Sequence, residues 1–114
     1  MNQEKINECI SICYACATTC LQCAQACFRE KEIDKLRDCI QLTQECAVLC
    51  RTAATIMAMD GHFNSEICEL CANACMACAE ECDEHAKHGM DHCRQCSHAC
   101  RTCAEACLSM VQVS

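Results

Sequence analysis

The chain has 114 residues, 19 of them cysteine, and a formal net charge of -7. This length suits one domain, and the acidic balance argues against nucleic acid as a partner. No continuous apolar run approaches the roughly 18 residues needed to cross a bilayer, so we expect no membrane partner.

Cysteine supplies much of the apolar composition. Leu, Ile, Val and Phe together number 18, roughly 16% of the chain, which is below the level that normally supports a packed globule. Short cysteine-rich chains are often secreted disulfide scaffolds. Here the N-terminal residues lead directly into an amphipathic pattern without an export region, and the cysteine count is odd. Disulfides between neighbours on one helix would also be strained. We therefore expect a cytoplasmic protein with free thiols.

The first predicted helix runs from about Gln3 to Arg29, before a charged turn over residues 30–33. Its cysteines are spaced alternately by four and three residues, which keeps them on one face of a helix with 3.6 residues per turn. They are Cys9, Cys13, Cys16, Cys20, Cys23 and Cys27. A second apolar stripe follows each thiol by one residue and can pack against another helix or a second subunit. It comprises Ile10, Tyr14, Ala17, Leu21, Ala24 and Phe28.

The second predicted helix opens at Asp34, a favourable N-cap residue, and reaches Met59. The Asp60-Gly61 pair supplies the stop, since glycine readily takes the left-handed conformation after a helix end. The expected inner face consists of Leu36, Cys39, Leu42, Cys46, Leu49, Cys50, Ala53 and Met57.

The third predicted helix starts at Asn64 or Ser65 and ends near Ala86. Gly89 breaks the chain, and Asp91 can cap a fourth helix that reaches Met110. The two thiol stripes are Cys68, Cys71, Cys75, Cys78 and Cys82, then Cys93, Cys96, Cys100, Cys103 and Cys107. Because short connectors make sequential helices antiparallel neighbours, we predict an all-α, up-down four-helix bundle with a cysteine-lined interior, as a single domain over residues 1–114.

Thiols in this pattern are suited to binding Cu(I). Cysteines four residues apart on a helix have Cβ atoms about 5 to 6 Å apart, and Cu(I) is a soft ion selected by thiolate ligands. Isolated buried thiolates are costly, whereas one Cu(I) neutralises one thiolate. We therefore predict that all 19 cysteines bind Cu(I), with a capacity between about ten and about nineteen ions per chain.

Weaker copper ligands lie at the two ends of the predicted bundle. His85 follows Cys82 by three residues and is predicted to be a further ligand, whereas His98 is expected to face solvent. The same end should hold His88, Met90, His92, Cys27, Cys39 and Cys93. The opposite end should hold Ile6, Met57, His62, Asn64 and Met110. Imidazole and thioether ligands exchange more readily than thiolates and suit an opening that passes ions inward.

The repeated Cys-x-x-x-Cys spacing within four proline-free helices resembles the cytosolic copper storage proteins, a bacterial family of cysteine-rich four-helix bundles. The resemblance extends from Cys9 to Met110. It implies storage of many Cu(I) ions along the bundle interior, without catalysis. It also implies a homotetramer of bundles. We expect copper chaperones or chelating thiols as partners.

Three other functions use the same residue type. An iron–sulfur electron carrier is suggested by short spacings such as Cys13-x-x-Cys16, although ferredoxin motifs lie in loops and include proline, which this chain lacks. A zinc or cadmium sink would use tetrahedral thiolate sets contributed by several helices. A redox enzyme would need a strand and helix framework of the thioredoxin kind, which the pattern does not predict.

Overall fold

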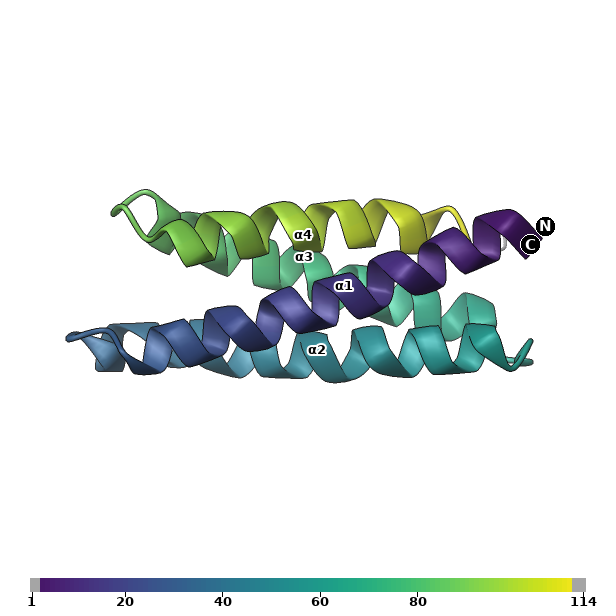
Figure 1. Ribbon diagram of the computed structural model, residues 1–114, viewed down its shortest axis with the longest axis horizontal. Helices are drawn as coiled ribbons and strands as arrows, with labels where there is room; N and C mark the ends of the chain where they lie inside the picture. The colour runs from purple at the N-terminus through teal and green to yellow at the C-terminus, as the bar shows by residue number, and fades with distance from the viewer. Residues whose placement is uncertain (1–2, 112–114) are drawn as a thin grey trace.

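The computed structural model describes residues 3–111, which form an antiparallel up-down bundle about 45 Å long and 21 by 19 Å across (Figure 1). Its elements are α1 (Gln3–Phe28), the 3-10 turn η1 (Ile33–Leu36), α2 (Arg37–Ala58), α3 (Asn64–Ala86) and α4 (Asp91–Leu108). The predicted all-α four-helix bundle is confirmed. The prediction of one domain over residues 1–114 includes terminal positions outside the described residues.

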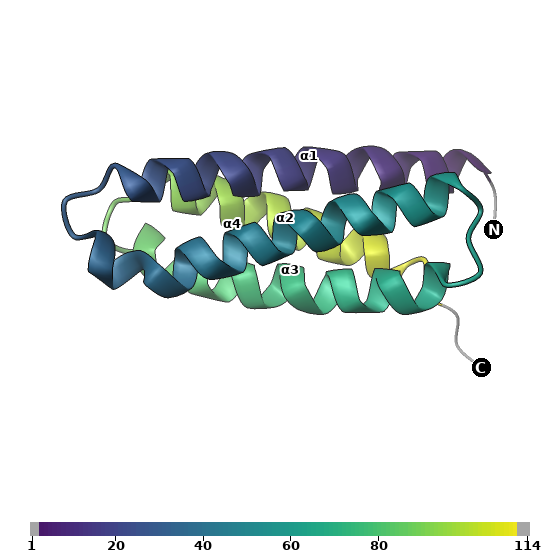
Figure 2. The ribbon, with the colours of Figure 1, turned by 90° about the horizontal axis from the view of Figure 1, so that it is seen from below.

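The four helices follow one another around the bundle, and α4 closes the ring by packing against α1. The α1–α2 and α3–α4 connections share one end, and the α2–α3 connection lies at the other, with the start of α1 and the end of α4 (Figures 1 and 2). We call these the histidine end, for His85, His88 and His92, and the methionine end, for Met57 and Met110. This topology fixes which side chains meet at each opening of the bundle.

Cysteine and alanine make up most of the core. None of the 19 cysteines, all within the described residues, is more than 2% exposed, and all are free thiols. Alanines such as Ala17, Ala53 and Ala79 fill positions beside the thiol stripes and are equally buried. These small side chains leave the thiols as the main polarizable groups inside the bundle.

At the histidine end, the helices α2 and α4 do not begin with the capping residues that we predicted. Asp34 does not cap α2, because it lies inside η1 and pairs with Arg37 at 3.1 Å. The buried Leu36 precedes α2 and gives no side-chain capping bond. Asp91 is likewise the first residue of α4 and pairs with Arg94, not a cap before the helix.

The stop after α2 is also made differently from the prediction. Asp60, not Gly61, takes the left-handed backbone conformation, with φ of 54°. Gly61 is needed for space, because a Cβ atom there would lie 2.6 Å from Cγ2 of Ile56. Gly89 has φ of 86° between α3 and α4, in agreement with its predicted role as a chain breaker.

The inner face of α2 contains Thr43 where we predicted Leu42. Thr43 is fully buried and its hydroxyl donates to the carbonyl of Cys39 at 2.8 Å, whereas Leu42 and Leu49 are only half-buried. Hydrophobicity favoured the leucines, but the four-three spacing from Cys39 through Thr43 to Cys46 sets the face. Thr43 therefore stands at a position in the stripe that a thiol could occupy.

The second apolar stripe of α1 divides into two sets. Ala17 and Ala24 are buried inside the bundle, whereas Tyr14, Leu21 and Phe28 are 45%, 43% and 48% exposed. The small residues lie close to neighbouring helices, and the larger ones remain on the outer surface.

An ionic contact ties α3 to α4 on the bundle surface. Asp83 accepts a hydrogen bond from Ser97 at 2.5 Å and pairs with Arg101. The Ser97 hydrogen bond, followed by Arg101, holds the pKa of Asp83 below its usual value. The contact helps to fix the register of the two helices that contribute ten thiols.

One described helix, α1, is long and apolar enough to cross a membrane by length and composition, with a window of mean hydropathy 1.2. This differs from our expectation because mean hydropathy counts scattered cysteines as apolar, although they form no continuous run. A core helix satisfies the same criterion, and the cysteines of α1 are buried inside the bundle, where α1 packs against α2 and α4.

Candidate metal centre

The thiols of all four helices meet along the bundle axis. The closest pairs join neighbouring helices, with 3.5 Å between the Sγ atoms of Cys13 and Cys107. Thiols on diagonally opposite helices also meet, with 3.8 Å between the Sγ atoms of Cys50 in α2 and Cys103 in α4. The thiols therefore form a continuous column along the bundle axis, to which every helix contributes. We call it the sulfur column.

Sets of four sulfurs lie within 4.8 Å of one another at successive levels of the bundle. They include Cys13, Cys71, Cys103 and Cys107; Cys16, Cys46, Cys50 and Cys75; Cys16, Cys20, Cys46 and Cys100; Cys20, Cys78, Cys96 and Cys100; and Cys23, Cys27, Cys39 and Cys93. The three central sets share members, as the last two of them share Cys20 and Cys100, so one sulfur can bridge ions at two levels. This arrangement suits a multinuclear cluster better than separate mononuclear sites.

The sulfur spacing also indicates the coordination geometry. Two metal–sulfur bonds of about 2.3 Å place the sulfurs about 4.6 Å apart in a line, but about 4.0 Å apart at a trigonal angle. The Sγ atoms of Cys16 and Cys20, on one turn of α1, are 4.0 Å apart, and those of Cys46 and Cys50 are 3.8 Å apart. These pairs fit trigonal and bridging coordination without movement, and linear coordination would need them to spread slightly.

Neighbouring thiols do not ionise alike. Hydrogen bonds donated by Cys23 and Cys27 stabilise the Cys93 thiolate and lower the pKa of Cys93 to about 4. The hydrogen bond of Cys9 with Cys107, together with burial, raises the pKa of Cys9 to about 12. Within a cluster, thiols that accept hydrogen bonds therefore have a lowered pKa, and thiols that donate them have a raised pKa. Because the thiolate is the form that binds a metal, the sulfurs with a lowered pKa are the ones best prepared to bind a soft cation.

At the histidine end, His92 extends the sulfur column. Its Nδ1 atom lies 3.4 Å from Sγ of Cys23 and 3.5 Å from Sγ of Cys93. Its Nε2 atom is buried without a hydrogen-bond partner and lies 3.6 Å from a carboxylate oxygen of Glu30. A carboxylate behind a histidine is the usual way to orient a metal-ligating imidazole.

His85 occupies a different environment from the predicted one. Its Nε2 atom lies 2.8 Å from a carboxylate oxygen of Glu81, one turn earlier on α3. The side chain is 15% exposed, and none of its described hydrogen bonds or ion pairs involves a thiol. His88 and His98 are exposed. The assignment of His85 as a copper ligand remains a prediction, and His92 is the histidine that the fold brings to the sulfurs.

At the methionine end, a thioether meets the last level of thiols. Sγ of Cys68 donates to Sδ of Met57 at 3.6 Å, and Met57 and Met110 are 3% and 4% exposed. Asn64 begins α3 beside them, and its Oδ1 atom is buried without a partner. The predicted grouping of these residues at one end is thus observed.

Sequence reasoning missed the pairing of His92 with Glu30. The two residues are far apart in the chain, and His92 lies one position before Cys93, outside the thiol stripe. The available signal was its place in the first turn of α4, where no preceding helical turn blocks the side chain from bending toward the bundle mouth.

The sequence was compared with models of known protein families. A model of the copper storage protein family matches residues 2–112. The chain belongs to the copper storage protein family. The Cys-x-x-x-Cys resemblance noted in the sequence is therefore confirmed.

Solved copper storage proteins share the fold over nearly the whole chain. A Cu(I)-bound copper storage protein, BsCsp3, is 42% identical, with a TM-score of 0.87, over 95% of this chain and 99% of that one. Apo copper storage protein 3 of Bacillus subtilis is 43% identical, with a TM-score of 0.84, over 93% and 98%. A cytosolic copper storage protein of Streptomyces lividans carrying five coppers is 33% identical, with a TM-score of 0.92, over 97% and 96%. Comparison with curated protein sequences gave no significant match.

Proposed function

We propose that this copper storage protein holds many Cu(I) ions per chain on the thiolates that line its core. The observation that carries the proposal is the continuity of the sulfur column. All 19 cysteines are buried, and thiol–thiol contacts of 3.5 to 4.0 Å join the helices along it. A purely structural core would gain nothing from thiols in register on four helices, because alanine or valine would pack without risk of oxidation.

Charge balance explains how such a core can fill. Each Cu(I) that binds displaces a thiol proton and adds one positive charge, so a ratio of one ion per thiolate leaves the interior neutral. The three central four-sulfur sets share members, which lets one thiolate serve two ions. We expect a capacity between about ten and about nineteen ions, with the upper value reached through bridging sulfurs.

The proposed ligands are all 19 cysteines, with His92 and, as the sequence suggested, His85 at the histidine end. His92 offers Nδ1 to an ion shared with Cys23 and Cys93, and the Glu30 carboxylate lies 3.6 Å behind its Nε2 atom, close enough to orient the ring after a small movement. His85 could join only if its ring turned away from Glu81. His92 is therefore the better supported of the two ligands.

The proposed role is storage and buffering in the cytoplasm, without catalysis. The family match indicates storage, and one solved relative is described as cytosolic. Copper chaperones or small chelating thiols would deliver and remove the ions. Thiolates bind Cu(I) so tightly that almost no uncomplexed ion is released into solution.

We further propose a homotetramer. The outer surface of α1 presents Tyr14, Leu21 and Phe28, and Val48 of α2 is 64% exposed. Apolar side chains in this density on a small chain favour packing against other copies. Sedimentation velocity of the metal-free and loaded protein measures the mass directly, and a monomer at micromolar concentration would contradict the proposal.

Anaerobic titration of the reduced protein with Cu(I), against a competing chelator of known affinity, tests the storage function. We expect saturation at ten or more ions per chain. Saturation at one or two ions would contradict storage. Parallel titrations with Zn²⁺ address the zinc sink, which the four-thiol sets could also support, and tight Zn²⁺ binding that resists Cu(I) would favour it.

A further inference from the structure

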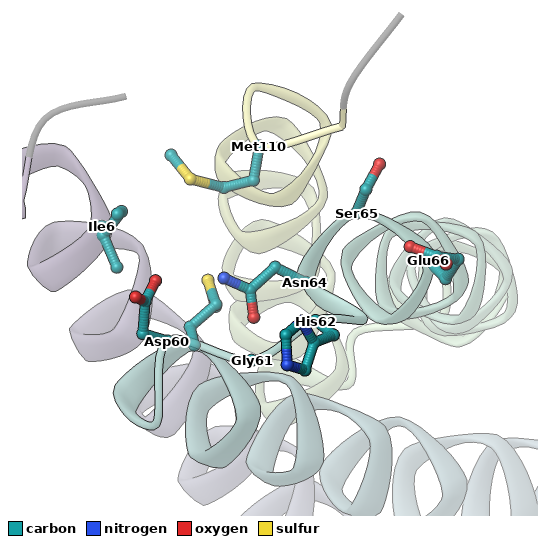
Figure 3. Close-up of a pocket in the computed structure, with 9 residues that line it drawn as sticks. Ile6, Asp60, Gly61, His62, Asn64, Ser65, Glu66 and Met110 are labelled. Atoms are coloured by element: carbon teal, nitrogen blue, oxygen red, sulfur yellow. The ribbon is translucent and has the colours of Figure 1, made fainter. Parts of the chain in front are cut away.

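The methionine end contains a cavity that lies outside the sulfur column. It has a volume of about 310 Å³ and opens among Ile6 of α1, the α2–α3 turn and the end of α4. Figure 3 shows the side chains of Ile6, Asn64 and Met110 pointing toward a common space from three different parts of the chain. A space of this volume can hold several waters or one ion with a carrier ligand.

The lining of the cavity combines soft and neutral oxygen ligands. Met57 and Met110 contribute thioethers, and Asn64 contributes the buried Oδ1 atom that has no hydrogen-bond partner. A buried polar atom without a partner is costly, and its presence in a small protein calls for an explanation such as a bound ion. Thioether and amide oxygen are weak ligands for Cu(I) compared with thiolate.

The cavity leads directly to the sulfur column. Met57 lines it, and Sδ of Met57 is 3.6 Å from Sγ of Cys68. A second depression of about 100 Å³ adjoins it, shares Met110, and reaches Cys9 between α1 and α4. Met57 therefore lies between the cavity and Cys68, and Met110 lies between the two depressions beside Cys9.

The rim of the cavity carries charge of the right sign for a cation. Asp60 and Glu66 line the cavity, and His62 is exposed beside them. Carboxylates at the mouth raise the local concentration of cations, while the weaker ligands inside bind an ion only transiently. Ligand strength thus increases from the rim to the thioethers and then to the thiolates.

We propose that this cavity is a second opening of the bundle, through which Cu(I) passes between carriers in solution and the Cys68 and Cys9 thiols by way of Met57, Met110 and Asn64. The inference rests on the proposed storage function. It gives the bundle two openings in parallel, one at each end, so that an ion bound near the methionine end need not cross the whole sulfur column to leave.

Kinetics of copper transfer test the opening. The variant Met57→Leu/Asn64→Leu/Met110→Leu removes the three ligands and keeps similar volumes, and Met59→Leu is the control because Met59 is exposed outside the cavity. We expect removal of Cu(I) by bathocuproine disulfonate to slow roughly twofold in the triple variant. Adding His92→Ala should slow removal at least about tenfold, because both paths are then impaired. Wild-type rates in the triple variant, with all slowing due to His92→Ala, would overturn the proposal.

A spectroscopic readout separates this proposal from the storage function. Protein made with selenomethionine at its six methionines is loaded with Cu(I) to saturation, so that the weaker ligands at the ends are also occupied, and X-ray absorption at the selenium edge detects copper–selenium scattering. We expect that signal, and its loss in Met57→Leu/Met110→Leu. Absence of the signal at every loading would overturn the second opening while leaving the measured total capacity, and with it the storage function, intact. Far-UV circular dichroism verifies that every variant remains helical.

Discussion

The Nδ1 atom of His92 lies 3.4 Å from the Sγ atom of Cys23, a residue that precedes it by most of the chain length. This contact joins the start of α4 to the last turns of α1 at the histidine end. It places an exchangeable ligand where the sulfur column reaches the surface. The histidine predicted from sequence to fill that role, His85, contacts Glu81 instead.

Replacing His92 by alanine should therefore affect copper uptake more than replacing His85. We expect His92→Ala to slow the uptake of the first ions from a Cu(I)–chelator complex severalfold, about threefold or more. His85→Ala should leave the rate near that of the wild type, because its ring is held by a carboxylate. Anaerobic stopped-flow absorbance measures both rates. A larger effect of His85→Ala would show that His85 leaves Glu81 to bind copper.

Glu30 should act through His92. The Glu30→Gln variant keeps the shape of the side chain but removes the charge 3.6 Å from Nε2 of His92. Loss of an orienting carboxylate typically weakens a histidine–metal bond by about tenfold or more, so the most weakly bound ions should be lost at lower chelator concentration. Competition titrations measure this. Glu32→Gln is the matched control, since Glu32 is exposed and pairs with Lys35. Equal effects of the two variants would indicate only a general change in charge.

Thr43→Cys should extend the thiol stripe of α2. Thr43 is fully buried at the position between Cys39 and Cys46, so a thiol there would face the core. We expect the capacity to rise by about one ion per chain. Thr43→Val is the control, because it also removes the hydrogen bond to the Cys39 carbonyl but adds no sulfur. Metal analysis after gel filtration gives the count, and an unchanged count in Thr43→Cys would mean that this level of the column is already saturated.

Removing thiols from the middle of the column should lower capacity without unfolding the metal-free chain. The variant combines Cys16→Ala, Cys20→Ala, Cys75→Ala and Cys78→Ala, which fall in the shared central sets. Alanine favours helix and fits the space of cysteine with a small cavity cost, so far-UV circular dichroism should be retained. Capacity should fall by about four ions or more. Loss of helix in the metal-free variant would indicate that these thiols are mainly structural.

Copper loading should stabilise the bundle. Ligands that bind only the folded state stabilise it by about 1.4 kcal/mol for each tenfold excess over the dissociation constant, and many ions bind here. The metal-free core relies on thiols and alanines, which bury little apolar surface each. We expect the midpoint of thermal unfolding to rise with each increment of Cu(I), and to return to the metal-free value after removal by a chelator. A midpoint independent of loading would place the ions outside the folded core.

The methionine end illustrates how far a residue pattern alone can be taken. Helical periodicity placed Met57 and Met110 at one end with Ile6 and Asn64, and the structure confirms that grouping. The cavity between them, and the unpartnered Oδ1 atom of Asn64, depend on how three chain segments leave a space. No spacing within one segment encodes such a space.

The sequence by itself determined the four helices, their antiparallel order and the burial of the thiols. The four-three spacing of cysteines admits only one face per helix, and short connectors admit only one topology. Only the tertiary structure decided that Thr43 and not Leu42 faces the core, that Asp60 makes the left-handed turn, and that His92 and not His85 reaches the sulfurs. Each of these depends on the rotation of a helix or the path of a turn relative to its neighbours. Such relations are set by packing between segments distant in the chain, which local spacing does not contain.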